Sequence, residues 1–342
     1  MTAVGLVGYG SAGRGIHAPR LAEAGCHVVA VSTSSDERAA QVRADLPDAT
    51  VVPGLPALLE QPGLDLVVLA SPSGVHAEQA RAVVDAGVAC VVDKPLAVDS
   101  RSAVSVVRYA ESAGVPLTVF QNRRFDPEHA TLQAVVDERM VGEPFRLELR
   151  WERWRPVPKD RWRENAPPQE GGGILLDLHT HLVDAAVRLL GPVERVAATV
   201  AARTTRAEDD AFLLCTHASG AVSHLSATSV AAAPGPRVRL LGTRGAYVLA
   251  DFEGEPHPWS GQSDLDADHC GWLYAGAERT PVPRRTSAQS DYYRAVAAAL
   301  AAPDPQAAMP VDPWDAVHVL AVVDAARAAA AEHRVVEVPR LG

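Results

Sequence analysis

The segment GYGSAG at residues 8–13 follows directly on an apolar run, and a helical segment comes after it. In the pattern G-x-G-x-x-G, the first glycine permits a tight turn and the second lets a pyrophosphate approach the backbone. The third allows the helix to pack closely on the strand, and the free N–H groups of the helix N-terminus then face a phosphate. Strand, glycines, helix and second strand occur in the order that a dinucleotide site requires. The sequence therefore predicts dinucleotide binding by one half of a Rossmann sheet.

Apolar runs and helical segments alternate over the first third of the chain. The expected strands are residues 3–8, 27–32, 65–71, 88–93 and 116–120, and the helices between them include 36–46, 75–86 and 100–113. Such continuous hydrophobicity is typical of strands that are covered on both faces. The segment AGV occurs at 86–88 and 113–115, where its glycine is expected to end a helix before the next strand. Short connections between alternating strands and helices predict a parallel, doubly wound sheet.

The pattern changes after about residue 122. A helix near 127–139 precedes a series of consecutive strands, and ASGAV at 218–222 predicts a tight turn between two of them. We expect a loop over 251–286 and helices at 287–301 and 312–331. The predicted fold is α/β, with an N-terminal Rossmann domain in residues 1–122. In residues 123–342 we expect an α+β domain with a large, mostly antiparallel sheet, whose last helix packs back on the first domain.

Charge and hydropathy exclude several classes of function. Asp and Glu number 42 against 32 Lys and Arg, so the net charge is −10 and a nucleic-acid or anionic-membrane partner is not expected. An apolar strand begins within three residues of the N-terminus, which leaves no room for a signal peptide. No apolar run is long enough to span a bilayer. We therefore expect a cytoplasmic protein.

The end of the second strand bears on the choice of dinucleotide. Sites that prefer NAD usually place a carboxylate there, but this chain has VSTSSDER at residues 31–38. Small hydroxyls in this segment can hydrogen-bond a 2′-phosphate, and Arg38 could form an ion pair with it. Alternatively, the hydroxyls cap the helix that starts near Asp36, and Asp36 itself reaches the ribose. NADP is the favoured cofactor, with NAD as the alternative.

Two further strand ends carry polar motifs, and a third motif opens a helix in the second half. The strand-end motifs are SPSGVH at residues 71–76 and DKP at 93–95. The third is GGGILLDLHTHLVD at 171–184, in which a helix would place Asp177 and His181 on one face. His179 would point away from that face, so the two histidines do not converge as metal ligands would and no metal is expected. Taken alone, without Lys94, the helix is better explained by two histidines with purely structural roles.

In their order and spacing, these motifs resemble the Gfo/Idh/MocA family of NAD(P)-dependent oxidoreductases, over essentially the whole chain. QNRRFD at 121–126 and RWRP…RWRE at 153–164 resemble the branch of NADP-dependent scyllo-inositol dehydrogenases. The family usually has Glu-Lys-Pro where this chain has Asp93-Lys94-Pro95, and glycine where it has His179. The resemblance implies a Rossmann domain followed by an α+β domain whose open sheet mediates oligomerisation, here as a homodimer or homotetramer.

The resemblance also implies a catalytic constellation of Lys94, Asp177 and His181. His181 would take the hydroxyl proton, since the ordinary pKa of histidine lies near neutral pH. Asp177 would orient it, Lys94 would hold the substrate oxygen, and the glycines at 171–173 would pass close to the nicotinamide. The expected cofactor-binding residues are Gly8, Tyr9, Gly10, Ser11, Ala12, Gly13, Ser32, Thr33, Ser34, Arg38, Ser71, Pro72, Ser73, His76, Asp93, Lys94 and Asn122. The expected substrate-binding residues are Lys94, Arg123, Trp162, Asp177 and His181.

The segment RWERWRPVPKDRWR at 150–163 combines tryptophans with arginines. Tryptophan faces stack on sugars and polyols, but the same residues are also enriched at interfaces between subunits.

Together with the family resemblance, the sequence predicts an oxidoreductase that transfers hydride between a nicotinamide and a secondary alcohol or ketone of a polyol, inositol or sugar. The alternatives are a catalytically silent dinucleotide-binding sensor, and a glycosidase-like enzyme that uses transient redox chemistry with bound NAD.

Overall fold

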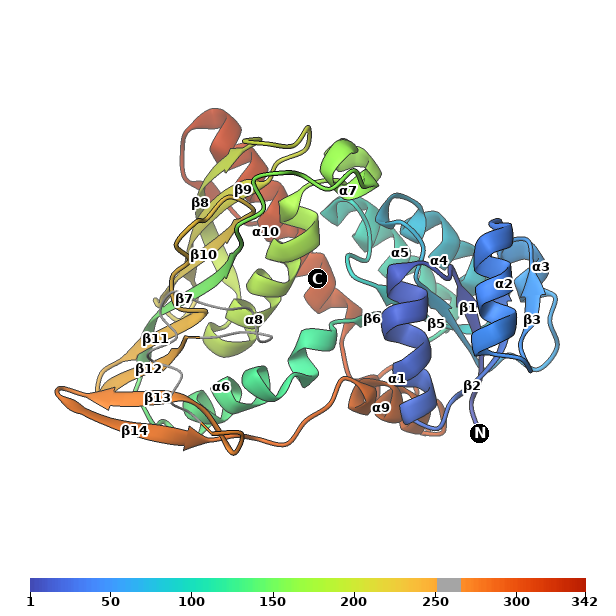
Figure 1. Ribbon diagram of the computed structural model, residues 1–342, viewed down its shortest axis with the longest axis horizontal. Coiled ribbons are helices and arrows are strands. Elements are labelled where there is room, and N and C mark those ends of the chain that lie inside the picture. The colour runs from blue at the N-terminus through green and yellow to red at the C-terminus, as the bar shows by residue number, and fades with distance from the viewer. Residues whose placement is uncertain (251–265) are drawn as a thin grey trace. The chain divides into compact units, whose positions relative to one another are not determined.

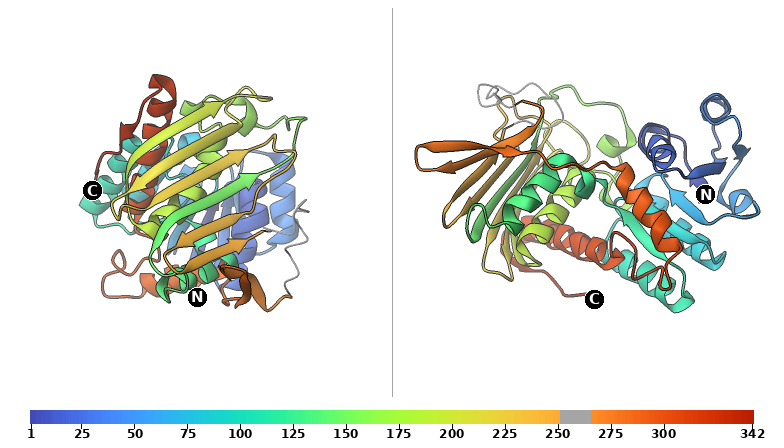
Figure 2. Two further views of the ribbon diagram at one scale, coloured as in Figure 1. Left: turned by 90° about the vertical axis from the view of Figure 1, so that its left-hand side faces the viewer. Right: turned by 90° about the horizontal axis from the view of Figure 1, so that it is seen from below.

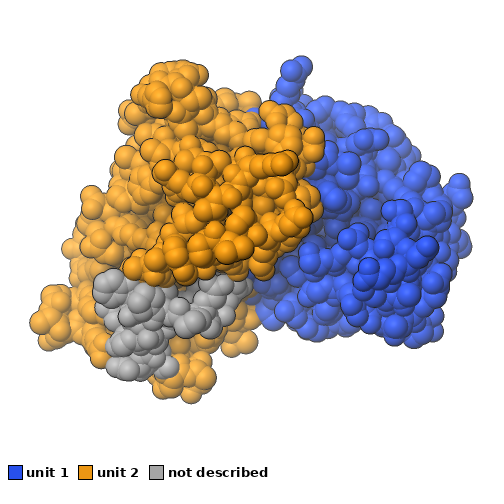
Figure 3. Space-filling view, turned by 45° about the horizontal axis from the view of Figure 1, so that its top comes forward, with its two compact units in different colours: residues 1–125, 288–317 blue, residues 126–287, 318–342 orange. Residues whose placement is uncertain are grey.

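The computed structural model describes residues 1–250 and 266–342, which form two compact units. The first unit comprises residues 1–125 and 288–317, and the second comprises residues 126–287 and 318–342 (Figure 3). The second domain was expected to comprise residues 123–342, but residues 123–125 and 288–317 belong to the first compact unit. The expected loop at 251–286 falls partly outside the described residues.

The first unit contains a six-stranded parallel sheet with the order β3-β2-β1-β4-β5-β6 (Figure 1). Its strands are β1 (Ala3–Val7), β2 (His27–Ser32), β3 (Thr50–Val52), β4 (Leu66–Leu69), β5 (Ala89–Asp93) and β6 (Leu117–Phe120). Its helices are η1 (Gly13–His17), α1 (Ala18–Glu23), α2 (Asp36–Asp45), α3 (Leu55–Leu59), η2 (Ser73–Val75), α4 (His76–Asp85), α5 (Ser100–Ala113), η3 (Asn122–Phe125) and α9 (Ser290–Leu300). The strand order reverses between β1 and β4, which is where doubly wound sheets bind ligands. The predicted Rossmann fold is confirmed.

Local signals account for several helix boundaries in this unit. Asp99 caps α5 by accepting a hydrogen bond from the Ser102 N–H at 2.7 Å. Gly87 and Gly114 adopt φ angles of 70° and 66°, the left-handed conformation that the repeated AGV segment predicted. Strand β3 and helix α3 were not among the expected elements, because both are too short to show a clear hydrophobic period.

The α9 helix belongs to the first unit because its tyrosines complete that unit's core. Tyr292 and Tyr293 are fully buried, and their rings lie 4.9 Å and 5.3 Å from the ring of Phe120 at the end of β6. Burying aromatic side chains of this size is among the largest single contributions to a core. The contact joins residues about 170 positions apart in the chain, so no local pattern could have predicted it.

The second unit contains a nine-stranded sheet with the order β14-β13-β12-β11-β7-β10-β9-β8-β15. The strands are β7 (Pro144–Glu152), β8 (Val193–Ala201), β9 (Asp210–His217), β10 (Val222–Thr228), β11 (Val238–Gly242), β12 (Gly245–Leu249), β13 (His269–Ala275), β14 (Glu278–Pro283) and β15 (Val336–Glu337). Only β10 and β7 pair in parallel, so the predicted mostly antiparallel sheet is confirmed. The expected tight turn at 218–222 does join β9 to β10 as a hairpin.

The expectation of a loop at 251–286 is wrong for its later part, which forms the hairpin of β13 and β14. Pro281 and Pro283 lie in β14, the terminal strand of the sheet. Proline has no N–H to donate to a neighbouring strand, but it is tolerated in an edge strand, which pairs on one side only. A segment that contains proline therefore resembles a loop in the sequence even where it forms such a strand.

Helices cover one face of the nine-stranded sheet, and Figure 2 (left) shows the opposite face toward the viewer. The helical elements of this unit are α6 (Pro127–Asp137), α7 (Trp162–Asn165), η4 (Pro168–Glu170), η5 (Leu175–His179) and α8 (Thr180–Leu190), and α10 (Pro313–Glu332) continues into it. The element η5 packs on β10, and α8 packs on both β7 and β10. Among the described residues, no helix is long and apolar enough to cross a membrane.

Candidate functional site

The glycine loop after β1 has no room for side chains at two of its three motif positions. Gly8 has a φ of 90°, and a Cβ added there would lie 2.9 Å from the carbonyl oxygen of Ala70. A Cβ added to Gly13 would lie 2.1 Å from the carbonyl oxygen of Gly8. These packing constraints keep the backbone of residues 8–13 tightly turned at the end of β1. Its geometry therefore fits the dinucleotide cradle that the motif predicts.

Tyr9, inside the glycine motif, packs into the first unit rather than facing outward. It is 2% exposed, and its hydroxyl donates to Asp45 Oδ2 at 3.2 Å. Burial and the Asp45 carboxylate raise the pKa of Tyr9 to about 12. The Nε of Arg14 lies 2.6 Å from the same carboxylate. The side chain of Tyr9 thus fastens the loop to α2, and only its backbone remains for the predicted cofactor contact.

The end of β2 combines hydroxyl groups with one arginine. Ser35 caps α2 by accepting a hydrogen bond from the Arg38 N–H at 3.4 Å, and Thr33 accepts one from the Ser35 N–H at 3.3 Å. The capping interpretation is therefore correct for Ser35. The guanidinium of Arg38 reaches back to the glycine loop, where a Cβ on Gly10 would lie 3.8 Å from its Cζ. Residues 32–35 contain no carboxylate, and Asp36 is exposed in the first turn of α2.

The loops after β4 and β5 are joined by His76, a role that the sequence did not predict. The ring is 1% exposed, with Nδ1 2.7 Å from the carbonyl oxygen of Pro95 and Nε2 2.9 Å from that of Ser71. Burial lowers the pKa of His76, although both carbonyls act in the opposite direction. The side chain predicted to contact cofactor thus lies between the two loops and holds the Lys94–Pro95 segment in place. Ser73 is buried as well, and Ser71 donates to Gln79 at 2.5 Å.

The carboxylate of Asp93 has two partners within the first unit. Its Oδ1 accepts the Lys94 backbone N–H at 2.8 Å, and its Oδ2 lies 3.5 Å from Nε2 of His17. Burial acts to raise the pKa of Asp93, but His17 and Lys94 outweigh it and the pKa is lowered. The other nitrogen of His17 lies 2.5 Å from the Tyr293 hydroxyl. His17 and Tyr293 were not predicted, because the second of these contacts spans 276 residues. Lys94 is half-buried directly after this network.

In the second unit, two of the three glycines before η5 pack closely against other residues of the same unit. A Cβ on Gly172 would lie 1.9 Å from the carbonyl oxygen of Ala166, and one on Gly173 would lie 2.2 Å from the carboxylate of Glu208. Gly171 and Gly173 have φ angles of 88° and 96°, which disfavour other residues. These contacts explain the glycines without a ligand. The role expected from the family resemblance, an approach to the nicotinamide, stays a prediction.

Asp177 and His181 follow these glycines on η5 and α8. The Asp177 carboxylate is one-third exposed, and its Oδ1 lies 3.3 Å from Nε of Arg163. His181 is 9% exposed, and its ring lies 5.6 Å from the ring of Trp151 on β7 at an angle of 31°. The η5 segment is a π-helix, which often occurs at functional sites. Both predicted residues therefore lie on one short stretch above the inner face of the sheet.

His179 lies in the core rather than at this site. It is fully buried, and its Nε2 is 3.3 Å from the carbonyl oxygen of Leu225 on β10. Burial lowers its pKa to about 4, so the ring is neutral near pH 7 and Nε2 donates to the carbonyl. The side chain that replaces the family glycine is thus a buried structural histidine whose Nε2 is bonded to the backbone. No group of three or more His, Cys, Asp or Glu residues in the described ranges could hold a metal.

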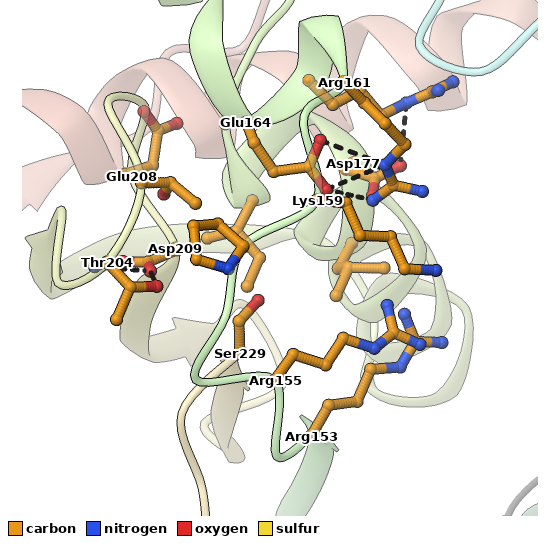
Figure 4. A pocket seen from close by; sticks show the side chains of 16 residues that line it. Arg153, Arg155, Lys159, Arg161, Glu164, Asp177, Thr204, Glu208, Asp209 and Ser229 are labelled. Atoms are coloured by element: carbon orange, nitrogen blue, oxygen red, sulfur yellow. Dashed lines mark hydrogen bonds and ion pairs between the residues drawn. The ribbon is translucent and has the colours of Figure 1, made fainter.

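A polar pocket opens beside Asp177, within the second unit (Figure 4). Its lining contains five cationic residues and four acidic ones, together with hydroxyl groups from Thr204, Thr205 and Ser229. The cations are Arg153, Arg155, Lys159, Arg161 and Arg163, all from the tryptophan- and arginine-rich segment that the sequence singled out. Pockets for drug-like ligands are lined mainly by apolar side chains, so this lining indicates a strongly hydrophilic ligand.

The remaining predicted residues are divided between the units. Asn122 is 7% exposed in η3, next to Arg123, and both belong to the first unit with Lys94. Trp162 lies in α7 of the second unit, where the guanidinium of Arg163 covers its ring at 4.4 Å. The Lys94, Asp177 and His181 constellation draws on both units and stays a prediction from the motifs.

Both parts of the chain match models of one protein family. Residues 2–121 match the oxidoreductase family with an NAD-binding Rossmann fold, and residues 129–248 match the GFO/IDH/MocA C-terminal domain. The uncharacterized oxidoreductase YdgJ of Escherichia coli (strain K12) is 38% identical over 246 residues, which cover 72% of this chain and 70% of YdgJ. The scyllo-inositol 2-dehydrogenase (NADP(+)) IolW of Bacillus subtilis (strain 168) is 28% identical over 348 aligned positions, which cover 97% of this chain and 95% of IolW.

A solved structure also resembles the whole chain. The structure of yvaA from Bacillus subtilis has a TM-score of 0.86 at 27% identity and covers 99% of this chain and 100% of its own. Together with the glycine loop, the reversal of strand order and the two family matches, these similarities identify the chain as an oxidoreductase with an NAD(P)-binding fold. The chain belongs to the Gfo/Idh/MocA family.

Proposed function

We propose that the protein is an NADP-preferring dehydrogenase that acts on a secondary alcohol, or the corresponding ketone, of a polyol, inositol or sugar. The observation that carries this proposal is the polar pocket at Asp177, whose charged and hydroxyl-bearing lining suits a polyhydroxylated ligand. The NADP-dependent scyllo-inositol dehydrogenase IolW, which aligns over nearly the whole chain, supports the same substrate class.

The preference for NADP is supported by the end of β2. A 2′-phosphate there would meet hydroxyl groups and the guanidinium of Arg38, which lies beside Gly10. An arginine binds phosphate through paired, charge-assisted hydrogen bonds. A carboxylate at residues 32–35 would repel the 2′-phosphate, and this chain has none there. The adenosine end of NADP is therefore the better match, although Asp36 leaves NAD as the alternative.

When bound, a nicotinamide dinucleotide would supply the redox chemistry of the proposed reaction, which is hydride transfer to or from the carbinol carbon. Lys94 holds the substrate oxygen and offsets the negative charge that develops on it. His181 takes the hydroxyl proton, with its ring supported by Trp151. Asp177, whose carboxylate pairs with Arg163, stabilises the histidine once it is protonated.

The rival functions receive less support. A catalytically silent sensor drew its support from His179 in place of the family glycine, but His179 is a buried core residue with a backbone partner. A glycosidase-like enzyme would retain its cofactor through purification. The absorbance of the protein after dialysis shows whether the dinucleotide has been released. Release supports a dehydrogenase, and retention supports the glycosidase-like enzyme.

The proposal includes a homodimer or homotetramer formed through the open face of the nine-stranded sheet. On β9, Phe212 and Leu214 are 41% and 39% exposed, while the alternate residues face the helices. Neighbouring apolar side chains on a sheet face favour association with another surface. Light scattering after size-exclusion chromatography measures the assembly, and a monomer at micromolar concentration would contradict this part.

The function is tested by following reduced nicotinamide formation with NADP and NAD over a panel of inositols, sugars and sugar acids. We expect turnover with NADP and at least one polyhydroxylated alcohol. Turnover with NAD alone would contradict the cofactor preference. Binding of NADP without turnover on any member of the panel would count against the dehydrogenase and favour the sensor.

A further inference from the structure

A buried series of polar contacts leads to Lys94 within the first unit. It begins at the hydroxyl of Tyr293 in α9, passes through the ring of His17 at the end of η1, and reaches the carboxylate of Asp93 at the end of β5. Tyr293 and His17 are fully buried, and the Asp93 side chain is 15% exposed. Three segments that are distant in the sequence therefore meet at the residue that precedes Lys94.

The hydroxyl of Tyr293 directs its proton at His17. Its oxygen lies 2.5 Å from Nδ1, which is its one hydrogen-bond partner among the described residues. Burial, with the neighbouring Tyr292 and Asp93, raises the pKa of Tyr293 well above its ordinary value, so the hydroxyl keeps its proton. A buried hydroxyl that does not donate leaves a polar hydrogen without a partner, which is unfavourable. Tyr293 therefore donates to Nδ1, and Nδ1 carries no proton.

The other ring nitrogen of His17 then carries the proton and faces Asp93. Nε2 lies 3.5 Å from Oδ2, which is longer than an ordinary N–H···O hydrogen bond, so the attraction is mainly electrostatic. Burial acts to raise the pKa of Asp93, but His17 and Lys94 lower it, so the carboxylate is ionised. An unprotonated Nε2 would instead place two acceptors against each other. The neighbours on both sides of the ring thus select the same tautomer, with the proton on Nε2.

Asp93 transmits this constraint to the backbone of Lys94. Its Oδ1 accepts the Lys94 N–H at 2.8 Å, while Oδ2 of the same carboxylate faces His17. Rotation of the carboxylate would weaken both contacts together, so the ring of His17 fixes the direction of Oδ1. After Lys94, the carbonyl oxygen of Pro95 is held by His76 at 2.7 Å. The lysine is therefore fixed in the backbone on both of its sides.

From these contacts we infer that Tyr293 and His17 are positioning residues, which hold Lys94 in place through Asp93. They act through Asp93 and not on the reactants, because both of them are fully buried. The inference rests on the proposed function for the role of Lys94, which is to hold the substrate oxygen. It also gives α9, a helix that the sequence assigned to the second domain, a part in the chemistry of the first unit.

Two adjacent tyrosines of α9 provide a matched pair of variants. Tyr292 and Tyr293 are both fully buried, but the Tyr292 hydroxyl lies 3.3 Å from Oγ1 of Thr118, outside the series of contacts to Asp93. We expect Y293F to lower kcat by about 10-fold, roughly the contribution of one hydrogen bond, with the Kd for NADP unchanged. Y292F removes an equally buried hydroxyl and should keep the original kcat.

Replacement of His17 separates its N–H group from its volume. H17Q places an amide N–H near the position of Nε2, whereas H17L has no donor. H17Q should therefore retain more of the original kcat than H17L. A purely structural role would give the two variants the same kcat, with any difference confined to their thermal stability, and that result would count against the inference.

The surroundings of Lys94 can be measured without a substrate, since the chain has only two lysines. In whole protein labelled with 13C in its lysines, K159R assigns the two Cε signals, and Lys159 in the second unit is the internal control. We expect Y293F to shift the NMR signal of Lys94, whereas Y292F leaves it in place and Lys159 stays unchanged in both. An unshifted Lys94 signal in Y293F would overturn the inference, as would equal shifts in Y292F and Y293F. Because Y293F removes a single oxygen atom, this test does not depend on the folding of H17L.

Failure of the inference and failure of the proposed function give different results. Turnover with NADP that is unchanged in Y293F, together with an unshifted Lys94 signal, leaves the dehydrogenase and removes the positioning role. A Lys94 signal that shifts in Y293F and not in Y292F, without turnover of any alcohol, supports the positioning role and removes the dehydrogenase.

Discussion

The glycine loop of the first unit and the charged pocket of the second both gather polar groups, but they do so by different means. The loop is held by backbone packing, since side chains at Gly8 and Gly13 would collide with carbonyl groups. The pocket is held by ion pairs between side chains, such as Asp177 with Arg163 and Glu164 with Arg161. A site built from backbone tolerates few substitutions, whereas a site built from charges can change its ligand by changing one residue.

The chain has two lysines, Lys94 in the first unit and Lys159 in the second. Replacing each of them should give the largest functional difference between the two units. Replacing Lys94 with methionine should lower kcat by roughly 1,000-fold while dinucleotide binding is unchanged, since the charge acts mainly in the transition state. Replacing Lys159 with methionine should raise KM and leave kcat near its original value. Steady-state kinetics and titration with NADP measure both. Near-normal kcat in K94M would contradict the proposed role of Lys94.

The stability of the protein should decrease at acid pH because of His179, the buried histidine of η5 in the second unit. His179 has a pKa of about 4 in the folded chain and an ordinary pKa of 6.5, so the unfolded chain binds more protons between these values. Its contribution to stability is therefore complete above about pH 6.5 and is lost as the pH falls toward 4. The loss amounts to about 3 kcal/mol.

Urea unfolding at several pH values measures this dependence. The variant H179Q should show a smaller decline in unfolding free energy between pH 6.5 and 4 than the unchanged protein. The matched control H27Q replaces an exposed histidine of β2 and should keep the original decline. An identical pH dependence in H179Q and the unchanged protein would mean that His179 is not the group responsible.

Gly13 tests the backbone-built site directly. The variant G13A should lower the unfolding free energy by about 1–3 kcal/mol and weaken dinucleotide binding, because its Cβ would lie 2.1 Å from the Gly8 carbonyl oxygen. Gly15 is the matched control, as a Cβ there would meet nothing within 4 Å. Fluorescence titration with NADPH and thermal unfolding measure both effects. Equal behaviour of G13A and G15A would argue against the cradle.

Arg38 is the side-chain element of the first site, so its removal should have the smallest effect. The variant R38Q should raise KM for NADP relative to NAD by about 10-fold, with little change in kcat. The matched control R43Q removes an exposed arginine farther along α2. If R38Q and R43Q have the same ratio of KM values for the two cofactors, Arg38 does not recognise the 2′-phosphate.

The parts that could be predicted are those whose cause is local. Continuous apolar runs separated by helices predicted the parallel sheet, because a strand that is buried on both faces is apolar along its whole length. The glycine motif and the AGV turns could be recognised in the sequence, because tight backbone conformations exclude most residues other than glycine. Asp177 and His181 could be placed on one helical stretch from their spacing. The proline-containing hairpin of β13 and β14 was not predicted, because the residues of β14 do not show that it pairs with β13.

Contacts between distant residues required the folded chain. Tyr293 meets His17 across 276 positions, and this contact brings α9 into the first core and sets the surroundings of Asp93. The contacts of His76, His179 and His181 cannot be read from the residues next to them in the sequence. Their roles as a link between loops, a core donor and a neighbour of Trp151 depend on which carbonyl or ring lies opposite each of them. Local conformational preferences act on neighbouring residues and can be read in order along the chain, whereas burial and pairing depend on side chains that only folding brings together.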